Sequence, residues 1–307
     1  MRRPEPLVSD VSGKLLQSIS PSCRICGRAK SDPLFDLSGY SLWRCPNCDF
    51  VYVGNRPDPG ELAGIYERLP LRHEKFRSAL AAQWENSRRL RLVRRYLGKD
   101  ASVLDAGCAT GDFVAQAKSF FRMSATDVAT SAVEIAKARN PECADRIWAG
   151  PLEKLTVNTQ FDAVCLWDVI EHIWDPLPVC QELMDRLRPG GFLFISTPDA
   201  GSLIARLLGS RWAFMIPPEH LSLFARRTFR ILFNGAMPAE IIYQRSLGKW
   251  TNLAFILYKL ERMLGLRIQT ALDWIARSRL GRIMLYIPTA DIQYLVVRKR
   301  DRTKHSH

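Results

Sequence analysis

The sequence lacks the features of several classes of protein. Its 307 residues contain no uninterrupted apolar run near the roughly 18 residues that a membrane-spanning helix needs. The first residues lack the apolar core of a secretory signal. A composition of 47% hydrophobic and 24% charged residues excludes disordered and collagen-like chains. We therefore expect a cytoplasmic globular protein with one large domain and an accessory module.

Basic charge is scarce in the middle of the chain. The formal net charge is +13, to which residues 1–99 contribute +8, residues 100–200 contribute −7 and residues 201–307 contribute +12. This distribution fits an acidic site for a cationic ligand between surfaces that attract an anionic one. A solvated basic surface with no partner is the alternative.

Cysteines are sparse outside one short stretch. Four of the eight follow the spacing C-x2-C-x18-C-x2-C, namely Cys23, Cys26, Cys45 and Cys48. In a reducing compartment this spacing predicts a structural zinc ribbon, because four sulfur ligands leave no position for water. Unligated or disulfide-bonded thiols are the alternative. The segment between the two pairs predicts a hairpin around Ser38-Gly39, and residues 50–53 predict a third strand. The remaining four are expected to be small buried side chains: Cys108, Cys143, Cys165 and Cys180.

Two helices are expected after the ribbon, at residues 61–69 and 73–98. Three- and four-residue spacing predicts a buried stripe on the second helix, formed by Phe76, Leu80, Trp84, Leu90, Val93 and Leu97. The arginines between these positions are predicted to form a solvated face, or else a docking patch for an anion: Arg88, Arg89, Arg91, Arg94 and Arg95.

From residue 100 onward, strands and helices are predicted to alternate. This order predicts an α/β fold with a parallel sheet covered on both faces, whose ligands bind at the carboxyl ends of the strands. We expect a zinc-ribbon module at residues 1–56, a helical linker or cap at 57–99 and the main domain at 100–307. A helical insertion is expected at about 249–283.

The first predicted strand of this domain ends in a glycine turn without the dinucleotide fingerprint. Ala109 stands where the middle glycine of that fingerprint would be. Asp105 and Asp112 flank the turn and would repel a pyrophosphate, whereas they suit an amino group or a sulfonium. Asp127, at the end of the second strand, is placed to accept hydrogen bonds from ribose hydroxyls. A ribose and a cationic tail together describe S-adenosylmethionine (SAM).

Four segments resemble, in order, the motifs of class I SAM-dependent methyltransferases: VLDAGCATG, ATDVATSAVEIAKAR, FDAVCLWDVIEHIWDPL and LRPGGFLFISTP. The resemblance implies a Rossmann-like seven-stranded sheet whose last strand is antiparallel, with residues 238–246 and 290–299 as the final strands. It also implies cofactor contacts from Asp105, Gly107, Cys108, Ala109 and Gly111 to the methionine part, Asp127 to the ribose, Leu152 and Glu153 to the adenine, and Trp167 and Asp168 beside the methyl group.

An acceptor hydroxyl needs a base, and histidines are the first candidates. His305 and His307 lie near the end of the chain and His73 begins a basic helix, which leaves His172 and His220. The segment at 216–237 resembles part of the acceptor wall of small-molecule methyltransferases. Its Glu219-His220 pair is similar to one in sugar C-methyltransferases that carry a four-cysteine zinc module. Glu219, His220 and His172 are therefore the candidate catalytic residues, with structural histidines as the alternative.

The sequence predicts a methyltransferase for a small acceptor, carbohydrate-like or lipid-linked and of anionic character. The insertion would cover the sheet and the acceptor pocket, or lie on a membrane surface. Two other functions are weighed against this one. An RNA methyltransferase would fit the basic flanks, but the Asn-Pro-Pro-Tyr and Pro-Cys motifs and any basic repeat interleaved with aromatics are absent. A non-catalytic zinc-ribbon scaffold is the alternative outside enzymes.

Overall fold

Strands and helices alternate through the middle of the chain, as the sequence predicts. The computed structural model describes residues 8–9, 15–16, 22–74, 79–151, 159–257, 274–275, 278, 280 and 283–300. The alternating elements are β6 (Ser102–Ala106), α3 (Asp112–Ala117), β7 (Arg122–Asp127), α4 (Thr130–Arg139), β8 (Ile147–Ala149), β9 (Phe161–Trp167), α5 (Pro176–Asp185) and β10 (Leu187–Pro198). Two long strands end the described chain, β12 (Ala239–Asn252) and β13 (Met284–Lys299).

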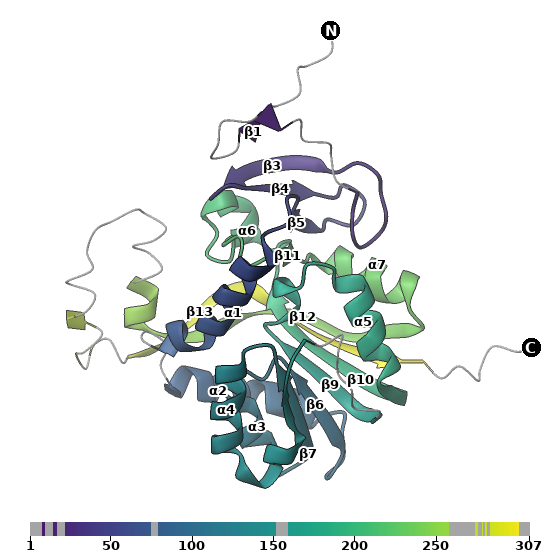
Figure 1. Cartoon of the computed structure of the whole chain (residues 1–307), viewed down its shortest axis with the longest axis vertical. Helices are drawn as coiled ribbons and strands as arrows, with labels where there is room; N and C mark the ends of the chain where they lie inside the picture. Colours follow the sequence, from purple (N-terminus) through teal and green to yellow (C-terminus); the bar gives the residue numbers. More distant parts are fainter. Residues whose placement is uncertain are drawn as a thin grey trace, which may run out of the picture.

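These strands form one seven-stranded sheet (Figure 1). Its order is β12-β13-β10-β9-β6-β7-β8. The strands from β6 to β10 pair in parallel, whereas β13 runs antiparallel to both of its neighbours. The predicted sheet with an antiparallel last strand is confirmed. Both final strands are longer than expected, and β12 continues to Asn252, so the predicted insertion cannot begin at residue 249.

Helices cover both faces of the sheet because its strands are apolar on both sides. Along β10, Leu193 and Ile195 pack with residues of α5 and α7 (Arg226–Ala236). Phe194 points the other way and packs with residues of α2 (Ala79–Val93), α3 and α4. This alternation along a strand produces the three layers of an α/β fold. The four cysteines expected to be buried side chains are buried.

A four-stranded sheet lies above the large one (Figure 1). It contains β3 (Asp32–Leu37), β4 (Tyr40–Arg44), β5 (Val51–Val53) and β11 (Ser222–Leu223), in the order β11-β5-β4-β3. The predicted hairpin is confirmed: Ser38 and Gly39 both have positive φ, 55° and 81°, as a two-residue hairpin turn requires. The third predicted strand is β5, while β11 comes from a distant part of the sequence that did not predict it.

The two helices before the large sheet differ in part from expectation. They are α1 (Pro59–Glu74) and α2, and the second ends five residues earlier than predicted. Leu90 and Val93 are buried as expected, but Leu80 and Trp84 are 42% and 37% exposed, so the predicted stripe is wrong at these two positions. Phe76 lies outside the described residues.

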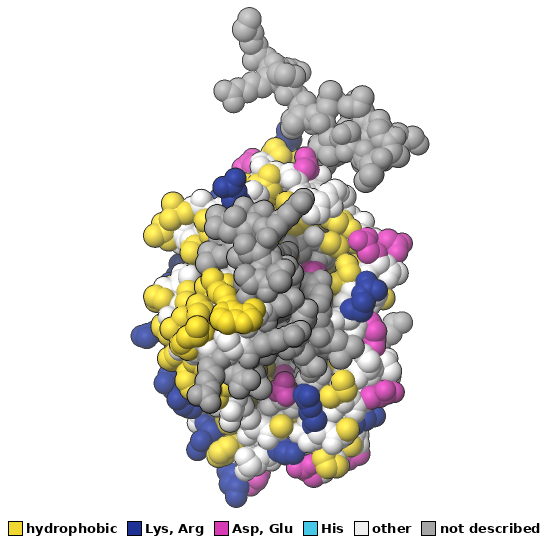
Figure 2. Space-filling view, turned by 90° about the vertical axis from the view of Figure 1, so that its left-hand side faces the viewer, with side chains coloured by type: hydrophobic (Ala, Val, Ile, Leu, Met, Phe, Trp, Pro, Cys, Tyr) yellow, Lys and Arg dark blue, Asp and Glu magenta, His cyan; other side chains and the backbone are white. Residues whose placement is uncertain are grey.

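Hydrophobic side chains gather on one face of the molecule (Figure 2). The exposed large hydrophobic residues include Leu203 and Leu207 of α6 (Leu203–Leu208), Trp274, and Tyr286 near the start of β13. In the described part of the chain, no helix combines the length and the apolar character needed to cross a bilayer. Most of the predicted insertion lies outside the described residues, so contact with a membrane surface stays a prediction.

Gly248 lies at a close approach between β12 and β13. The register shifts between Leu247 and Lys249, and a Cβ added at Gly248 would lie 2.0 Å from the carbonyl oxygen of Ile287. We expect Gly248→Ala to lower the free energy of unfolding by about 1–3 kcal/mol, because the strands must separate to admit the methyl group. Urea denaturation measures this change.

Gly235→Ala is the matched control. Gly235 is exposed near the end of α7, and an added Cβ there meets no atom within 4 Å. Its stability should stay the same or rise slightly, since alanine is the better helix former. Equal stabilities of the two variants would contradict the close approach at Gly248.

Candidate active site

The carboxyl ends of the parallel strands bring four polar residues to one edge of the sheet. Asp105 lies near the end of β6, Asp127 ends β7, Asp168 follows β9, and Ser196 lies near the end of β10. In an open α/β sheet this edge is where ligands bind. The structure therefore assembles the acidic residues that the sequence singles out.

The glycine turn after β6 forms a close-fitting cradle. The backbone N–H groups of Gly107 and Cys108 both donate to the carbonyl oxygen of Thr126, over 2.7 and 2.9 Å. Gly107 has φ of 88°, and a Cβ added there would lie 2.3 Å from a methyl group of Val169. Ala109 also adopts a positive φ, 45°, a region that L-residues other than glycine avoid. The turn is thus packed closely against the end of β7 and against Val169.

Asp105 is a buried carboxylate with an unused oxygen. It is 1% exposed, and in the described part of the chain its Oδ1 atom has no hydrogen-bond partner. Burial raises the pKa of Asp105 to about 7, although the positive charge of Arg89 opposes the change. An orphaned, buried carboxylate oxygen fits a ligand that brings an ammonium group.

Asp127 is held by the backbone at the end of β7. Its Oδ2 accepts the N–H of Ala109 over 2.8 Å, and its Oδ1 accepts the N–H of Ala129 over 2.9 Å. Each carboxylate oxygen has a second acceptor position, which suits a pair of ribose hydroxyls. Burial raises its pKa despite these hydrogen bonds.

The structure describes some of the remaining predicted cofactor residues but not all of them. Leu152 and Glu153 lie outside the described residues. Trp167 is buried, with its ring centroid 5.5 Å from that of Phe113. Asp168 accepts a hydrogen bond from the hydroxyl of Ser196 over 2.8 Å. The turn residues Gly107, Cys108, Ala109 and Gly111 lie beside Asp105 and Asp127, as the sequence predicts.

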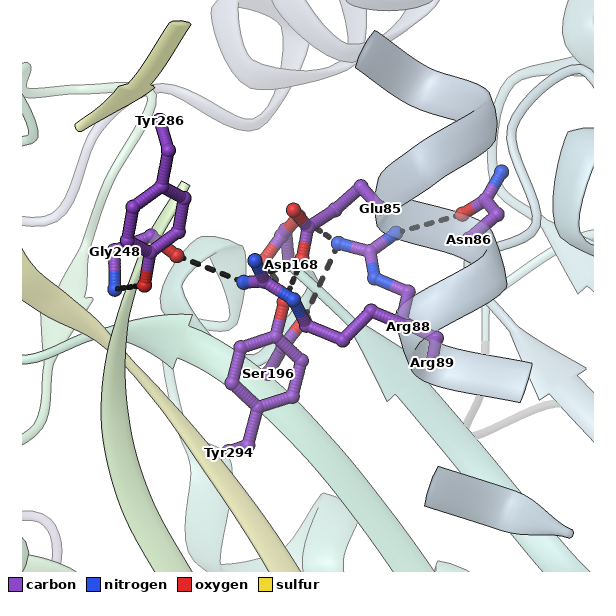
Figure 3. Close-up of polar contacts among 9 residues, drawn as sticks. All are labelled: Glu85, Asn86, Arg88, Arg89, Asp168, Ser196, Gly248, Tyr286 and Tyr294. Atoms are coloured by element: carbon purple, nitrogen blue, oxygen red, sulfur yellow. Dashed lines mark hydrogen bonds and ion pairs between the residues drawn. The ribbon is translucent and has the colours of Figure 1, made fainter. Parts of the chain in front are cut away.

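Arg89 was predicted to be solvated, and this prediction is wrong. The side chain is buried and forms an ion pair with Asp168 (Figure 3). It also donates to the Ser196 hydroxyl over 3.3 Å and to the side-chain oxygen of Asn86 over 3.2 Å. The reason is that α2 packs against the sheet, where Asp168 needs a cation. Arg89 precedes the buried Val93 by four residues, and this helical spacing was the available signal.

Further polar contacts tie α2 to the last two strands (Figure 3). The hydroxyl of Tyr294 hydrogen-bonds to Glu85, and Arg88 donates to the carbonyl oxygen of Gly248 over 2.7 Å. The backbone N–H of Gly248 donates in turn to the hydroxyl of Tyr286. These contacts fix the distance of α2 from the sheet, and so the position of Arg89.

His172 and His220 come together although 47 residues separate them. His172 ends the short helix η3 (Ile170–His172), and its ring centroid lies 4.9 Å from that of His220. Nδ1 of His172 lies 2.6 Å from the carbonyl oxygen of Glu219, and Nδ1 of His220 lies 2.7 Å from that of Phe214. A carbonyl can only accept, so each Nδ1 carries the hydrogen, and the neutral ring has its lone pair on Nε2. Burial lowers the pKa of His172 and favours that neutral form.

Two residues that the sequence analysis missed complete this group. Glu171 is buried and accepts the Thr197 hydroxyl over 2.9 Å; burial raises its pKa to about 8. Tyr66 of α1 donates its hydroxyl to the carbonyl oxygen of His172 over 2.8 Å. The ligand atoms of Glu171, His172 and His220 lie within 4.8 Å of one another, so this group could hold a cation or act on a proton. Glu171 was readable as the neighbour of His172, whereas nothing local marked Tyr66.

The four-cysteine cluster has the dimensions of a tetrahedral metal site. The Sγ atoms of Cys23 and Cys48 lie 3.5 Å apart, as do those of Cys26 and Cys45, and all four lie within 4.8 Å of one another. Zinc–sulfur bonds of about 2.3 Å place tetrahedral sulfurs about 3.8 Å apart. The hydrogen bond between Cys23 and Cys48 lowers the pKa of the first thiol and raises that of the second, whereas a bound metal would require both as thiolates.

Comparison with known proteins agrees with this geometry. The sequence profile of a family described as "Methyltransferase domain" matches residues 73–236, more than half of the chain. The chain belongs to this family. It is a SAM-dependent methyltransferase.

The sequence matches to named relatives span only part of the methyltransferase. It is 28% identical over 167 residues to a ubiquinone biosynthesis O-methyltransferase of Bordetella avium, a match that spans 48% of this chain and 69% of the relative. It is 34% identical over 140 residues to a probable S-adenosylmethionine-dependent methyltransferase of Mycolicibacterium smegmatis, spanning 43% of this chain and 52% of the relative. The chain thus spans about half the length of that second relative.

Solved structures share the fold of the methyltransferase. A putative methyltransferase from Bacillus halodurans has a TM-score of 0.50 at 15% identity, covering 69% of this chain and 98% of that one. A possible histamine N-methyltransferase from Thermotoga maritima has a TM-score of 0.51 at 15% identity, covering 77% of this chain and 99% of that one. At this identity the likeness establishes the Rossmann-like fold alone.

Replacing Arg89 tests whether its buried guanidinium supports the site. We expect Arg89→Met to lower the free energy of unfolding by about 2 kcal/mol, less than for a fully buried pair because Asp168 is partly exposed. Thermal unfolding should then occur about 4–8 °C lower. The control Arg91→Met removes an exposed arginine from the last turn of the same helix and should change stability by less than about 0.5 kcal/mol. A variant at Arg89 that is as stable as its control would contradict the assignment.

Proposed function

We propose that this methyltransferase transfers the methyl group of SAM to a hydroxyl group of a small acceptor, carbohydrate-like or lipid-linked. The pairing of His172 and His220 at the carboxyl edge of the sheet carries the proposal, because hydroxyl acceptors need a base. The relative from Bordetella avium supports it, since that protein is named an O-methyltransferase. The anionic character of the acceptor remains a prediction from the basic flanks.

The cofactor would be held at its two polar ends. The unused oxygen of Asp105 would accept the ammonium group, and Asp127 would accept the ribose hydroxyls. When bound, SAM supplies a methyl group on a positively charged sulfur, which is reactive toward an oxygen nucleophile. Trp167 and Asp168 would border that group, and Leu152 and Glu153 remain the predicted contacts to adenine. Gly107, whose missing side chain makes room for Val169, would border the methionine part.

His220 would take the proton of the acceptor hydroxyl on Nε2. The carbonyl oxygen of Phe214 accepts from Nδ1, which orients the ring and stabilises the charge that the ring gains. His172 is held in the same manner by the carbonyl of Glu219, and it lines the same space. The acceptor oxygen would bond to the methyl carbon as the carbon–sulfur bond breaks, so positioning contributes much of the rate.

The four-cysteine cluster would bind one structural zinc ion. Its sulfur spacing and the sequence pattern support this assignment. We propose residues 1–56 as the zinc module, 57–99 as a helical cap that supplies Tyr66 and Arg89, and 100–307 as the catalytic domain. On this division both non-catalytic parts reach the acceptor side.

The role of Asp105 predicts how SAM affinity depends on pH. Its pKa of about 7 means that the carboxyl is ionised above neutrality and protonated below it, and only the ionised form attracts an ammonium group. We expect the SAM dissociation constant to rise about tenfold from pH 8 to pH 6. Calorimetric titration at three pH values measures this dependence.

Asp105→Asn should bind SAM at least about tenfold more weakly at pH 8 and lose most of the pH dependence. Asp145→Asn is the control, because Asp145 is an exposed carboxylate beside Arg146. An affinity for SAM that is independent of pH in the wild-type protein would remove Asp105 from the ammonium site.

The role of His220 predicts a separation of turnover from cofactor binding. We expect His220→Gln to lower turnover about 100-fold or more, because the base is lost, while the SAM dissociation constant changes less than twofold. Release of S-adenosylhomocysteine is measured against a panel of nucleotide sugars, lipid-linked sugars and phenols. His305→Gln, near the end of the chain, is the matched control. Full turnover in the His220 variant would overturn the proposed mechanism.

A further inference from the structure

The backbone of Leu221 joins the four-cysteine module to the histidine pair. Leu221 follows His220 directly and is 1% exposed. Its N–H donates to the carbonyl oxygen of Glu171 over 2.8 Å, and its own carbonyl oxygen accepts the N–H of Val53 over 3.1 Å. The backbone of this one buried residue therefore contacts the segment of His172 on one side and β5 on the other.

The pairing continues into β11. Ser222 and Leu223 pair antiparallel with Tyr52 and Val51, so β11 is the outer strand of the small sheet. The hydroxyl of Ser222 donates to the carbonyl oxygen of Ile173 over 2.7 Å. The chain just after His220 is thus fixed by hydrogen bonds to the module and to the residue after His172.

Arg24 makes a second link from inside the first cysteine pair. It lies between Cys23 and Cys26, and its guanidinium stacks over the ring of Trp174 at 3.8 Å. One of its nitrogens donates to the carbonyl oxygen of Val53 over 3.1 Å. Trp174 lies two residues after His172.

The second cysteine pair is also tied to the catalytic domain. The carbonyl oxygen of Cys48 accepts the hydroxyl of Thr228 over 2.8 Å, and the ring of Phe50 lies 5.2 Å from that of Phe224. The buried cysteines share one hydrophobic core with α5, α7 and one face of the large sheet. A change in the cysteine loops must therefore move atoms of the catalytic domain.

We propose that the four-cysteine module is a positioning element of the acceptor site, in which the metal-loaded cysteine loops hold His220 and His172 in place through Leu221 and Trp174. Arg24 is the positioning residue. The proposal rests on the proposed function for the role of the histidines. On the cofactor side, Asp127 is held by the backbone N–H groups of Ala109 and Ala129, neither of which belongs to the module. A change that frees the four-cysteine module from Leu221 and Trp174 should thus lower turnover of the acceptor and leave SAM binding unchanged.

Arg24→Met tests the link without touching a cysteine. We expect bound zinc to remain at one equivalent and the SAM dissociation constant to change less than twofold. Turnover per acceptor should fall about tenfold or more, since misplaced catalytic groups lose rate steeply. Hydrogen exchange of the Leu221 amide should become faster, and the NMR signals of the His172 and His220 rings should shift. Arg24→Lys should restore these properties in part, because it keeps the charge but not the planar stack.

Arg28→Met is the matched control, because Arg28 is exposed and lies two residues after Cys26. It should leave zinc content, exchange and turnover unchanged. Removing zinc from the full-length protein with a chelator should accelerate exchange at Leu221 and shift the histidine signals while SAM still binds, and added zinc should reverse both effects. Unchanged exchange and unchanged histidine signals in Arg24→Met would overturn the proposal, even where the metal-free protein fails to stay folded.

The two proposals fail in different ways. Lost turnover in His220→Gln together with unchanged acceptor kinetics in Arg24→Met would leave the proposed function standing and remove the positioning role. Full turnover in His220→Gln would remove the base itself, while the exchange of Leu221 and the histidine signals would still report whether the module holds this segment.

Discussion

Burying carboxylates at the ends of parallel strands is the constraint on which the site depends. Asp105 is almost fully buried, and Asp168 is partly covered, so each needs a cation or a ligand to offset the loss of water. Arg89 supplies the cation for Asp168 and lies close enough to oppose the rise in the pKa of Asp105. The placement of α2 follows, because its buried face must deliver that arginine to the sheet edge.

The acceptor side follows another rule, since backbone carbonyls orient its side chains. His172 is held by the carbonyl of Glu219 and His220 by that of Phe214. Tyr66 donates to the carbonyl of His172 and so ties α1 to the same segment. The positions of the two rings thus depend on the paths of two loops, and substitutions that keep those paths can change nearby side chains without moving the rings.

Local patterns were enough to predict the strands, their alternation with helices and the cysteine cluster, because each is encoded within a short stretch. The carboxylates Asp105 and Asp127 were readable for the same reason: strand ends in a parallel sheet share one edge. Tyr66 and β11 were not, since each acquires its role from a contact far away in the sequence. For Arg89, helical spacing indicated burial but not the distant partner Asp168. Leu80 and Trp84 were predicted to be buried but are exposed, because helical spacing alone does not tell which face of α2 meets the sheet.

The pairing of β5 with β11 also bears on how the chain is made. The small sheet has its first three strands early in synthesis, but the strand that covers the edge of β5 emerges only after β6 to β10. Until then β5 presents unpaired N–H and C=O groups, which is the kind of edge that other chains can join. The small sheet is therefore completed only as the catalytic domain folds.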